Sequence, residues 1–321
     1  MQVFDQISFN NTACSVEYNS LLDLYAVGTY ELVETKTNEQ GLISHQERQG
    51  ECILYDCKER KFNVIDSKST PGTLDIKWMK DFIAVVDAKG YLSVDKYENK
   101  KLKQLSLVDC KSDNQSLALS LDWSNSRKEV EPIVAVSMSD GRALTVNSAT
   151  EQVLVDWQAH DYETWIAAWD HYKPNDIIYT GADDCVLKCW DLRSGVDTPI
   201  ASNKRFEGGV TTIANSPHDQ NIIAVGSYDE NLRIFDKRNI NKPINSIKTS
   251  GGIWRIKFSE VENMRMVMAN MYGGFDVVNY QTNVIEYTNS DHNLAYGVDW
   301  NRDGLIMSAS FYDKKGMLWV V

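Results

Sequence analysis

The sequence lacks the features that mark membrane and secreted proteins. No stretch approaches the roughly 18 consecutive apolar residues of a membrane-spanning helix, and the start, MQVFDQISFNN, has neither the basic nor the apolar part of a secretory signal. Its six cysteines form no CxxC pair and are too sparse for a disulfide scaffold. We therefore expect a reduced, cytoplasmic protein without a membrane span.

Basic residues are also scarce, and several catalytic motifs are missing. The chain has 33 Lys and Arg against 45 Asp and Glu, a formal net charge of −12, which repels nucleic acid and attracts cationic groups. It contains no GxSxG nucleophile motif, no glycine-rich phosphate loop and no His, Cys and carboxylate spacing typical of a metal site. The sequence thus predicts no nucleic-acid partner, no metal and no cofactor.

What the chain does contain is a repeat. Six segments each have an apolar strand, a turn and a second apolar strand, and a seventh copy near the N-terminus is split by a polar insertion at 33–50, to which the sequence assigns no role. The six are residues 82–98, 133–150, 177–195, 222–239, 266–281 and 305–321. A period of roughly 40 to 45 residues with several short strands per unit is typical of a β-propeller.

The Trp-Asp ending at Trp190 and Asp191 resembles the WD-repeat family, and the resemblance spans essentially the whole chain. Seven units predict an all-β, seven-bladed WD-repeat β-propeller, with residues 1–321 as one domain. The last unit stops at Val321 after three strands, whereas the strand-like MQVFDQISF has no unit of its own. We expect this N-terminal strand to close the ring, because closure removes an open sheet edge.

Aromatic residues recur at one slot, four residues before the end of the innermost strand. In WD-repeat proteins this slot and the residue before each turn Asp lie at the top mouth of the channel, where partners bind, and the slot two residues before the aromatic one belongs to the same face. The residues that this resemblance puts there are Trp165, Trp254, Tyr296, Tyr228, Tyr312, Asp183 and Glu163. Aromatic faces beside carboxylates attract a quaternary ammonium ion, so we expect a cation-binding cup. The alternative is that the rings pack on one another and cap the channel.

Two histidines stand out. WD repeats place a structural histidine where His160 lies, and it would bond Thr180, Asp184 and Trp190 of its own blade; the alternative for His160 is substrate binding. His292, beside Asp291, is one position out of that register. It is therefore open to either a functional or a structural role.

Several segments resemble a more specific family. QAHDYETWIAAW, GADDCVLKCWDLR, VGSYDENLRIFDKR, GGIWRIKF, LAYGVDW and SFYD, which lie within residues 158–319, resemble the diphthine methyl ester hydrolase family, the WD-repeat proteins of diphthamide biosynthesis. The resemblance implies a carboxylic ester hydrolase that removes a methyl ester from the modified histidine of elongation factor 2, before ATP-dependent amidation by another enzyme. Elongation factor 2 and other enzymes of the pathway are the partners it implies.

Diphthine carries a trimethylammonium group beside its ester, which is the cation that the expected cup would hold. For catalysis we expect His292 to be the general base on water, oriented by Asp291, with Tyr296 or Tyr312 donating to the developing oxyanion. Ser227 as a nucleophile is the weaker variant, since no histidine is paired with it in the sequence.

A non-catalytic class competes with this hypothesis. The blade endings WDLR (190–193) and FDKR (235–238) resemble the Trp-Asp-x-Arg motif of substrate receptors for cullin-type ubiquitin ligases. In such an adaptor, Arg193 and Arg238 would contact a partner on the bottom face. The other interpretation pairs these two arginines with carboxylates of their own blades.

Overall fold

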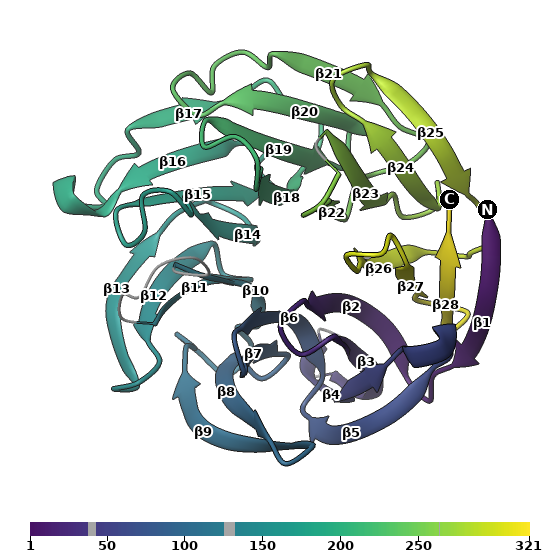
Figure 1. Cartoon of the computed structure of the whole chain (residues 1–321). Helices are drawn as coiled ribbons and strands as arrows, with labels where there is room; N and C mark the ends of the chain where they lie inside the picture. Colours follow the sequence, from purple (N-terminus) through teal and green to yellow (C-terminus); the bar gives the residue numbers. More distant parts are fainter. Residues whose placement is uncertain (38–42, 125–131, 263) are drawn as a thin grey trace.

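Seven four-stranded antiparallel sheets surround a central channel in the computed structural model, which describes residues 1–37, 43–124, 132–262 and 264–321 (Figure 1). This confirms the predicted all-β, seven-bladed propeller. No helix in these ranges is long and apolar enough to cross a membrane.

The innermost strands line the channel, and we call the end where they begin the top and the end where they finish the bottom. They are, from blade one to blade seven, β2 (Thr12–Asn19), β6 (Thr73–Met79), β10 (Ala118–Trp123), β14 (Thr164–Trp169), β18 (Val210–Asn215), β22 (Arg255–Phe258) and β26 (Ala295–Trp300).

The remaining strands follow outward in each blade. The second strands are β3 (Leu24–Thr37), β7 (Phe82–Asp87), β11 (Ile133–Met138), β15 (Ile177–Ala182), β19 (Ile222–Ser227), β23 (Arg265–Ala269) and β27 (Ile306–Ser310). The third strands are β4 (Ile43–Asp56), β8 (Tyr91–Glu98), β12 (Arg142–Asn147), β16 (Leu187–Asp191), β20 (Asn231–Asp236), β24 (Phe275–Asn279) and β28 (Lys315–Val320). The outer strands are β5 (Asn63–Thr70), β9 (Lys101–Asp109), β13 (Gln152–Gln158), β17 (Ala201–Asn203), β21 (Asn245–Lys248), β25 (Val284–Asn289) and β1 (Gln2–Ser8). Two short 3-10 turns, Lys58–Arg60 and Leu192–Ser194, follow β4 and β16.

The N-terminal strand closes the ring as predicted. β1 pairs antiparallel with β28, from Gln2 opposite Val320 to Ser8 opposite Lys315, and the two chain ends lie side by side (Figure 1). Because β28 would otherwise present unpaired backbone groups, this pairing protects the edge of blade seven.

The insertion in blade one continues the hairpin of β3 and β4. The two strands stay paired beyond the length of other blades, with Glu31 opposite Gln49 and Leu32 opposite Arg48. Lys314 of blade seven forms an ion pair with Glu31 at 3.0 Å. This pair fixes the base of the hairpin beside the top of the channel.

Large apolar side chains fill the space between blades. Trp123, Trp169 and Trp319 are among the largest fully buried side chains, and each lies in an apolar cluster that joins two adjacent blades. This core holds the innermost strands rigidly, so it fixes which side chains reach the channel.

Candidate functional site

The repeated slot at the top of the channel is a β-bulge. The pairing of β14 with β15 skips Trp165, and the pairing of β26 with β27 skips Tyr296. The equivalent residue is also skipped in blades one, two, three and five, and Trp254 immediately precedes β22. A bulge leaves one residue unpaired and redirects its side chain. This backbone feature explains why one sequence position repeatedly supplies residues to the channel mouth.

The aromatic side chains at this mouth contact one another. The ring centroids of Trp254 and Tyr296 are 4.7 Å apart and nearly parallel, and Trp165 meets Trp254 edge to face at 5.8 Å. Tyr228 lies 6.1 Å from Trp165 and 6.2 Å from Trp254. We call Trp165, Tyr228, Trp254 and Tyr296 the aromatic platform.

The platform differs in shape from the predicted cup. A cation held by aromatic faces lies within about 6 Å of each ring centroid, so rings already stacked at 4.7 Å leave no room for a cation between Trp254 and Tyr296. The packing alternative therefore describes these two rings, and a cation can only lie over the platform. Tyr312 lies at the edge of the platform and is 57% exposed, with its ring centroid 5.2 Å from that of Phe311.

Carboxylates lie beside the platform. The indole Nε1 of Trp165 donates to Asp183 at 3.1 Å, and the backbone carbonyl of Glu163 accepts from the backbone N–H of Asp183 at 3.0 Å. Burial raises the pKa of Tyr228, and the negative charges of Asp183 and Glu163 add to this effect. The platform is thus a neutral aromatic surface in a negative local potential, which favours a cation.

His160 occupies the structural position. It is 1% exposed, with Nδ1 2.8 Å from Asp184 and Nε2 2.8 Å from the hydroxyl of Thr180, which is 2.9 Å from the indole nitrogen of Trp190. Burial lowers the pKa of His160, so the neutral ring donates from Nδ1 and accepts at Nε2. Its donor and acceptor are both used inside blade four, and substrate binding by His160 is not supported by this geometry.

His292 and Asp291 are not joined in the described structure. The carboxylate of Asp291 is exposed and lies 3.1 Å from the ammonium of Lys315. Neither ring nitrogen of His292 has a hydrogen-bond partner among the described residues, and both are shielded from solvent. The ring instead meets Phe275 edge to face at 4.7 Å, and burial lowers the pKa of His292 to about 4. Asp291 therefore does not orient His292, because its charge is neutralised elsewhere.

Ser227, the alternative nucleophile that the sequence suggested, has a structural role in its turn. Ser227 is fully buried, and its hydroxyl donates to the carbonyl of Gly208 at 2.9 Å and accepts from the backbone N–H of Asp229 at 3.1 Å. With both functions of the hydroxyl used in the turn, the hydroxyl is not free to attack a substrate.

Both arginines of the adaptor hypothesis pair within their own blades. Arg193 contacts Asp191 at 2.7 Å and Asp176 at 3.6 Å, and Arg238 contacts Asp236. The two arginine side chains are 64% and 74% exposed. Both arginines lie at the ends of β16 and β20 that are opposite the top turns. The directions of these strands therefore place them on the bottom face, where the sequence predicted them.

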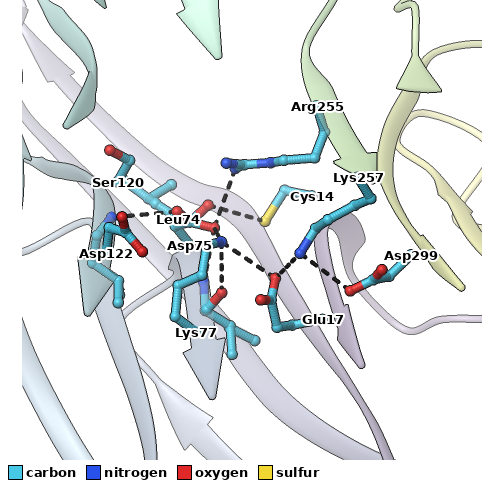
Figure 2. Close-up of polar contacts among 12 residues, drawn as sticks. Cys14, Glu17, Leu74, Asp75, Lys77, Ser120, Asp122, Arg255, Lys257 and Asp299 are labelled. Carbon is cyan, nitrogen blue, oxygen red and sulfur yellow. Dashed lines mark hydrogen bonds and ion pairs between the residues drawn. The ribbon is translucent and has the colours of Figure 1, made fainter. Parts of the chain in front are cut away.

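Sequence reasoning missed a chain of charged side chains inside the channel. Six charged groups from blades six, two, one and seven alternate in sign, and each contacts the next (Figure 2). They are Arg255, Asp75, Lys77, Glu17, Lys257 and Asp299. We call them the channel charge chain.

Distances within the chain are those of direct ion pairs. Asp75 is 3.1 Å from Arg255 and 3.2 Å from Lys77, and the Arg255 and Lys77 cations hold the pKa of this fully buried carboxyl below its usual value, against the effect of burial. Lys257 contacts Glu17 and is 3.1 Å from Asp299. Burial raises the pKa of Asp299 to about 6, although Lys257 opposes the shift.

A signal for this chain is present in the sequence alignment of the blades. One row of residues in the innermost strands is charged in five blades and alanine in blades four and five. Its members directly precede Tyr18, Trp78, Trp123, Trp169, Asn215, Phe258 and Trp300. The row is Glu17, Lys77, Asp122, Ala168, Ala214, Lys257 and Asp299.

A cavity of about 440 Å³ occupies the lower part of the channel. Its lining includes the two alanines of the row, which leave the space that charged side chains take elsewhere. It also includes every charge-chain residue except Asp75, namely Glu17, Lys77, Arg255, Lys257 and Asp299. Asp122 also lines it, 3.1 Å from Nε2 of His171.

The fold and the hydrogen-bonded tetrad of Asp184, His160, Thr180 and Trp190 in blade four define a WD-repeat propeller. The family model described as "WD domain, G-beta repeat" matches residues 199–236. A chain in a crystal structure of the mitotic checkpoint complex aligns with 100% of this chain and 94% of its own at a TM-score of 0.77. At 12% identity, this likeness shows the fold alone.

Sequence relatives are more specific. A diphthine methyltransferase homolog of Dictyostelium discoideum is 33% identical over 364 residues, which cover 96% of each chain. The diphthine methyltransferase of Schizosaccharomyces pombe is 32% identical over 310 residues, or 92% of this chain and 90% of its own. The chain therefore belongs to the diphthine methyltransferase family, within the diphthamide pathway, and the similarity extends beyond residues 158–319 to nearly the whole chain.

Proposed function

We propose that this protein is a carboxylic ester hydrolase that removes the methyl ester from diphthine on elongation factor 2. Family membership supports a reaction on diphthine that involves a methyl group. The observation that carries the proposal is the aromatic platform beside Asp183 and Glu163, because a trimethylammonium group cannot donate hydrogen bonds and is held by aromatic faces and nearby negative charge.

In this proposal the trimethylammonium group lies over the platform rather than between its rings. The rings of Trp165 and Tyr228 meet edge to face and form a corner that two methyl groups can contact. Asp183 borders this corner through its bond to Trp165. The ester, one carbon away from the ammonium, then lies within reach of neighbouring side chains.

The reaction we propose is attack of water on the ester carbonyl carbon. The water oxygen forms the new C–O bond, the bond from the carbonyl carbon to the methoxy oxygen breaks, and the methoxy group leaves as methanol with one proton. The products are the diphthine carboxylate, methanol and a second proton. A donor for the oxyanion and an acceptor for the water proton are the two groups that such a step needs.

Tyrosine hydroxyls supply the donor. Burial raises the pKa of Tyr296 to about 12, so its hydroxyl stays protonated at neutral pH, and Tyr312 is exposed at the edge of the platform. For the acceptor we keep His292 without Asp291. Its neutral ring has no competing hydrogen bond among the described residues, but its nitrogens are shielded, so this role requires the segment between β25 and β26 to open.

The test uses elongation factor 2 that carries methylated diphthine, in water labelled with heavy oxygen. Attack at the carbonyl puts one heavy oxygen into the product carboxylate, which intact mass detects, and releases unlabelled methanol. Transfer of the methyl group to an acceptor would leave both carboxylate oxygens unlabelled. That outcome would refute hydrolysis while leaving the family assignment in place.

Variants locate the site. Trp165→Ala should raise KM by about tenfold or more, because a cation–π contact in a partly desolvated site contributes up to about 2 kcal/mol. Tyr312→Phe should lower kcat, with Tyr272→Phe as a matched control, since Tyr272 is 69% exposed and has no role in the proposal. Unchanged kinetics in both the Trp165 and Tyr312 variants would move the site away from the platform.

A further inference from the structure

The proposed function leaves the cavity in the lower part of the channel unused. Its volume of about 440 Å³ falls within the roughly 300–1,000 Å³ of small-molecule pockets. Residues at the bottom ends of the innermost strands and in the loops that follow line it, including Asn19, Lys80 and Pro217. The cavity is therefore reached from the bottom, at the opposite end of the channel from the aromatic platform.

One end of the cavity offers donors for an anion. Arg255 lies above Lys257 along β22, and among the described residues its guanidinium donates one hydrogen bond, to Asp75 at 3.1 Å. Since a guanidinium has five N–H groups, it retains donors while buried at the cavity wall. Arg255 and Lys77 both contact the carboxylate of Asp75, and Lys77 also contacts Glu17, so Arg255 is the cation that offers remaining donors at this end.

The other end offers carboxylates and aromatic side chains. Glu17 contacts the ammonium groups of Lys77 and Lys257, and Asp299 contacts that of Lys257. Both contacts of Glu17 use Oε2, so its Oε1 has no ion-pair contact among the described residues. Asp122 adds a third carboxylate. This end therefore has an excess of negative charge.

Aromatic residues line the same cavity as these carboxylates. Tyr18, Trp78, Trp123, Phe258 and Trp300 all line the cavity, one from each of blades one, two, three, six and seven. Aromatic rings next to carboxylates suit a quaternary ammonium ion. The alanines of blades four and five supply the free volume opposite the charge chain.

We propose that the lower channel cavity binds a betaine-type zwitterion, a group that carries a trimethylammonium beside a carboxylate. The carboxylate lies against Arg255 and the trimethylammonium lies between Glu17, Asp122 and the aromatic residues. The assignment of a betaine rests on the proposed function, because hydrolysis of an ester beside a trimethylammonium group leaves this pair of charges. Arg255 and Lys77 would repel a ligand that carries only a positive charge, and the carboxylates would repel one that carries only a negative charge.

The test measures binding of glycine betaine by isothermal titration calorimetry to the full-length protein carrying Trp165→Ala, which disables the platform as a second site for a trimethylammonium group. The variants below are added to this background. Tetramethylammonium and acetate serve as probes with one charge each. We expect betaine to bind about tenfold or more tightly than either, since each charged end contributes its own contacts. Absence of saturable betaine binding, or equal affinity for tetramethylammonium, would overturn the proposal.

Variants place the ligand in the channel. Ala214→Leu fills the cavity without touching a charge and should abolish betaine binding, and Arg255→Lys keeps the charge but loses the guanidinium fork and should weaken it about tenfold. Trp254→Ala, at the platform, should leave betaine affinity unchanged. Unfolding midpoints identify variants that fail to fold. Loss of betaine binding in the Trp254 variant, with unchanged binding in the folded Ala214 variant, would refute the channel site.

Methyl release measured with betaine present separates the possible sources of the ligand. Competitive inhibition that Ala214→Leu removes would mean that the modified side chain itself enters the cavity, and release that betaine inhibits only through the platform, or not at all, would mean a separate channel site for a free zwitterion; either result retains the channel site. Betaine binding without any methyl release would refute the proposed function alone. Methyl release without betaine binding would refute the channel site alone.

Discussion

Replacement of His292 by Phe gives a direct measure of what an unpartnered histidine costs this fold. Both ring nitrogens are shielded and lack partners among the described residues, and a buried polar group without a hydrogen bond costs about 1–3 kcal/mol. Phe has nearly the same shape and keeps the edge-to-face contact with Phe275. We therefore expect His292→Phe to raise the free energy of unfolding by about 1–3 kcal/mol at pH 7.

The pH dependence provides a second, independent magnitude. Histidine titrates near pH 6.5 in an unfolded chain, and in the native protein the pKa of His292 is about 4. Between these values the unfolded chain binds a proton that the native protein does not, so stability falls as the pH drops from about 6.5 to about 4. A difference of about 2.5 pH units corresponds to a loss of about 3 kcal/mol. The loss should be absent above pH 6.5 and missing in the Phe variant.

Urea denaturation from pH 4 to 8, followed by tryptophan fluorescence, measures both effects. The difference between wild type and variant removes the contribution of other titrating groups. A variant less stable than wild type at pH 7, or a difference independent of pH, would show that the His292 ring has partners in solution and would refute the reasoning. Methyl release by the folded variant would additionally exclude His292 as the base.

Three further predictions concern the scaffold. Thr180→Val should lower the free energy of unfolding by about 2–4 kcal/mol in urea, because it leaves the ring nitrogens of its histidine and tryptophan partners unpaired; a loss below about 0.5 kcal/mol would contradict the tetrad. Lys257→Met should cost about 3–5 kcal/mol, because it removes the lysine contact of the buried Asp299 carboxylate and one of the two lysine contacts of Glu17. Lys101→Met, in an ion pair whose lysine is 72% exposed, should cost less than about 1 kcal/mol; equal losses would contradict this comparison. Deletion of residues 1–9 should lower the melting temperature and produce aggregates in size-exclusion chromatography, since it exposes the edge of β28; a monomer of unchanged melting temperature would argue against closure by β1.

The repeat pattern was sufficient to predict the blades because it is local. Each blade is a set of strands joined by short turns, so the order of apolar segments and turns along the chain already determines its pairing. The missing last strand of blade seven and the unassigned strand at the N-terminus together predicted ring closure, which the pairing of β1 with β28 confirms. The slot of Trp165, Trp254 and Tyr296 was also readable, because a bulge at the same strand position recurs in most blades.

The contacts within the site were beyond the sequence. Whether Trp254 would leave a cup or stack on Tyr296 depends on the distance between blades six and seven. Whether Asp291 would meet His292 depends on which partner its carboxylate reaches first, and Lys315 of a neighbouring strand takes it. No local pattern encodes either distance.

The sequence by itself determined a seven-bladed ring, its closure and the face on which aromatic residues gather, since periodicity along one chain specifies all three. Only the tertiary structure decided that the platform is stacked and that a charge chain crosses the channel. Glu17 and Lys257 are 240 positions apart and come into contact because ring closure brings blade six next to the strands of blades seven and one. A contact across the channel depends on the geometry of the whole ring, which a repeat of roughly 40 residues does not contain.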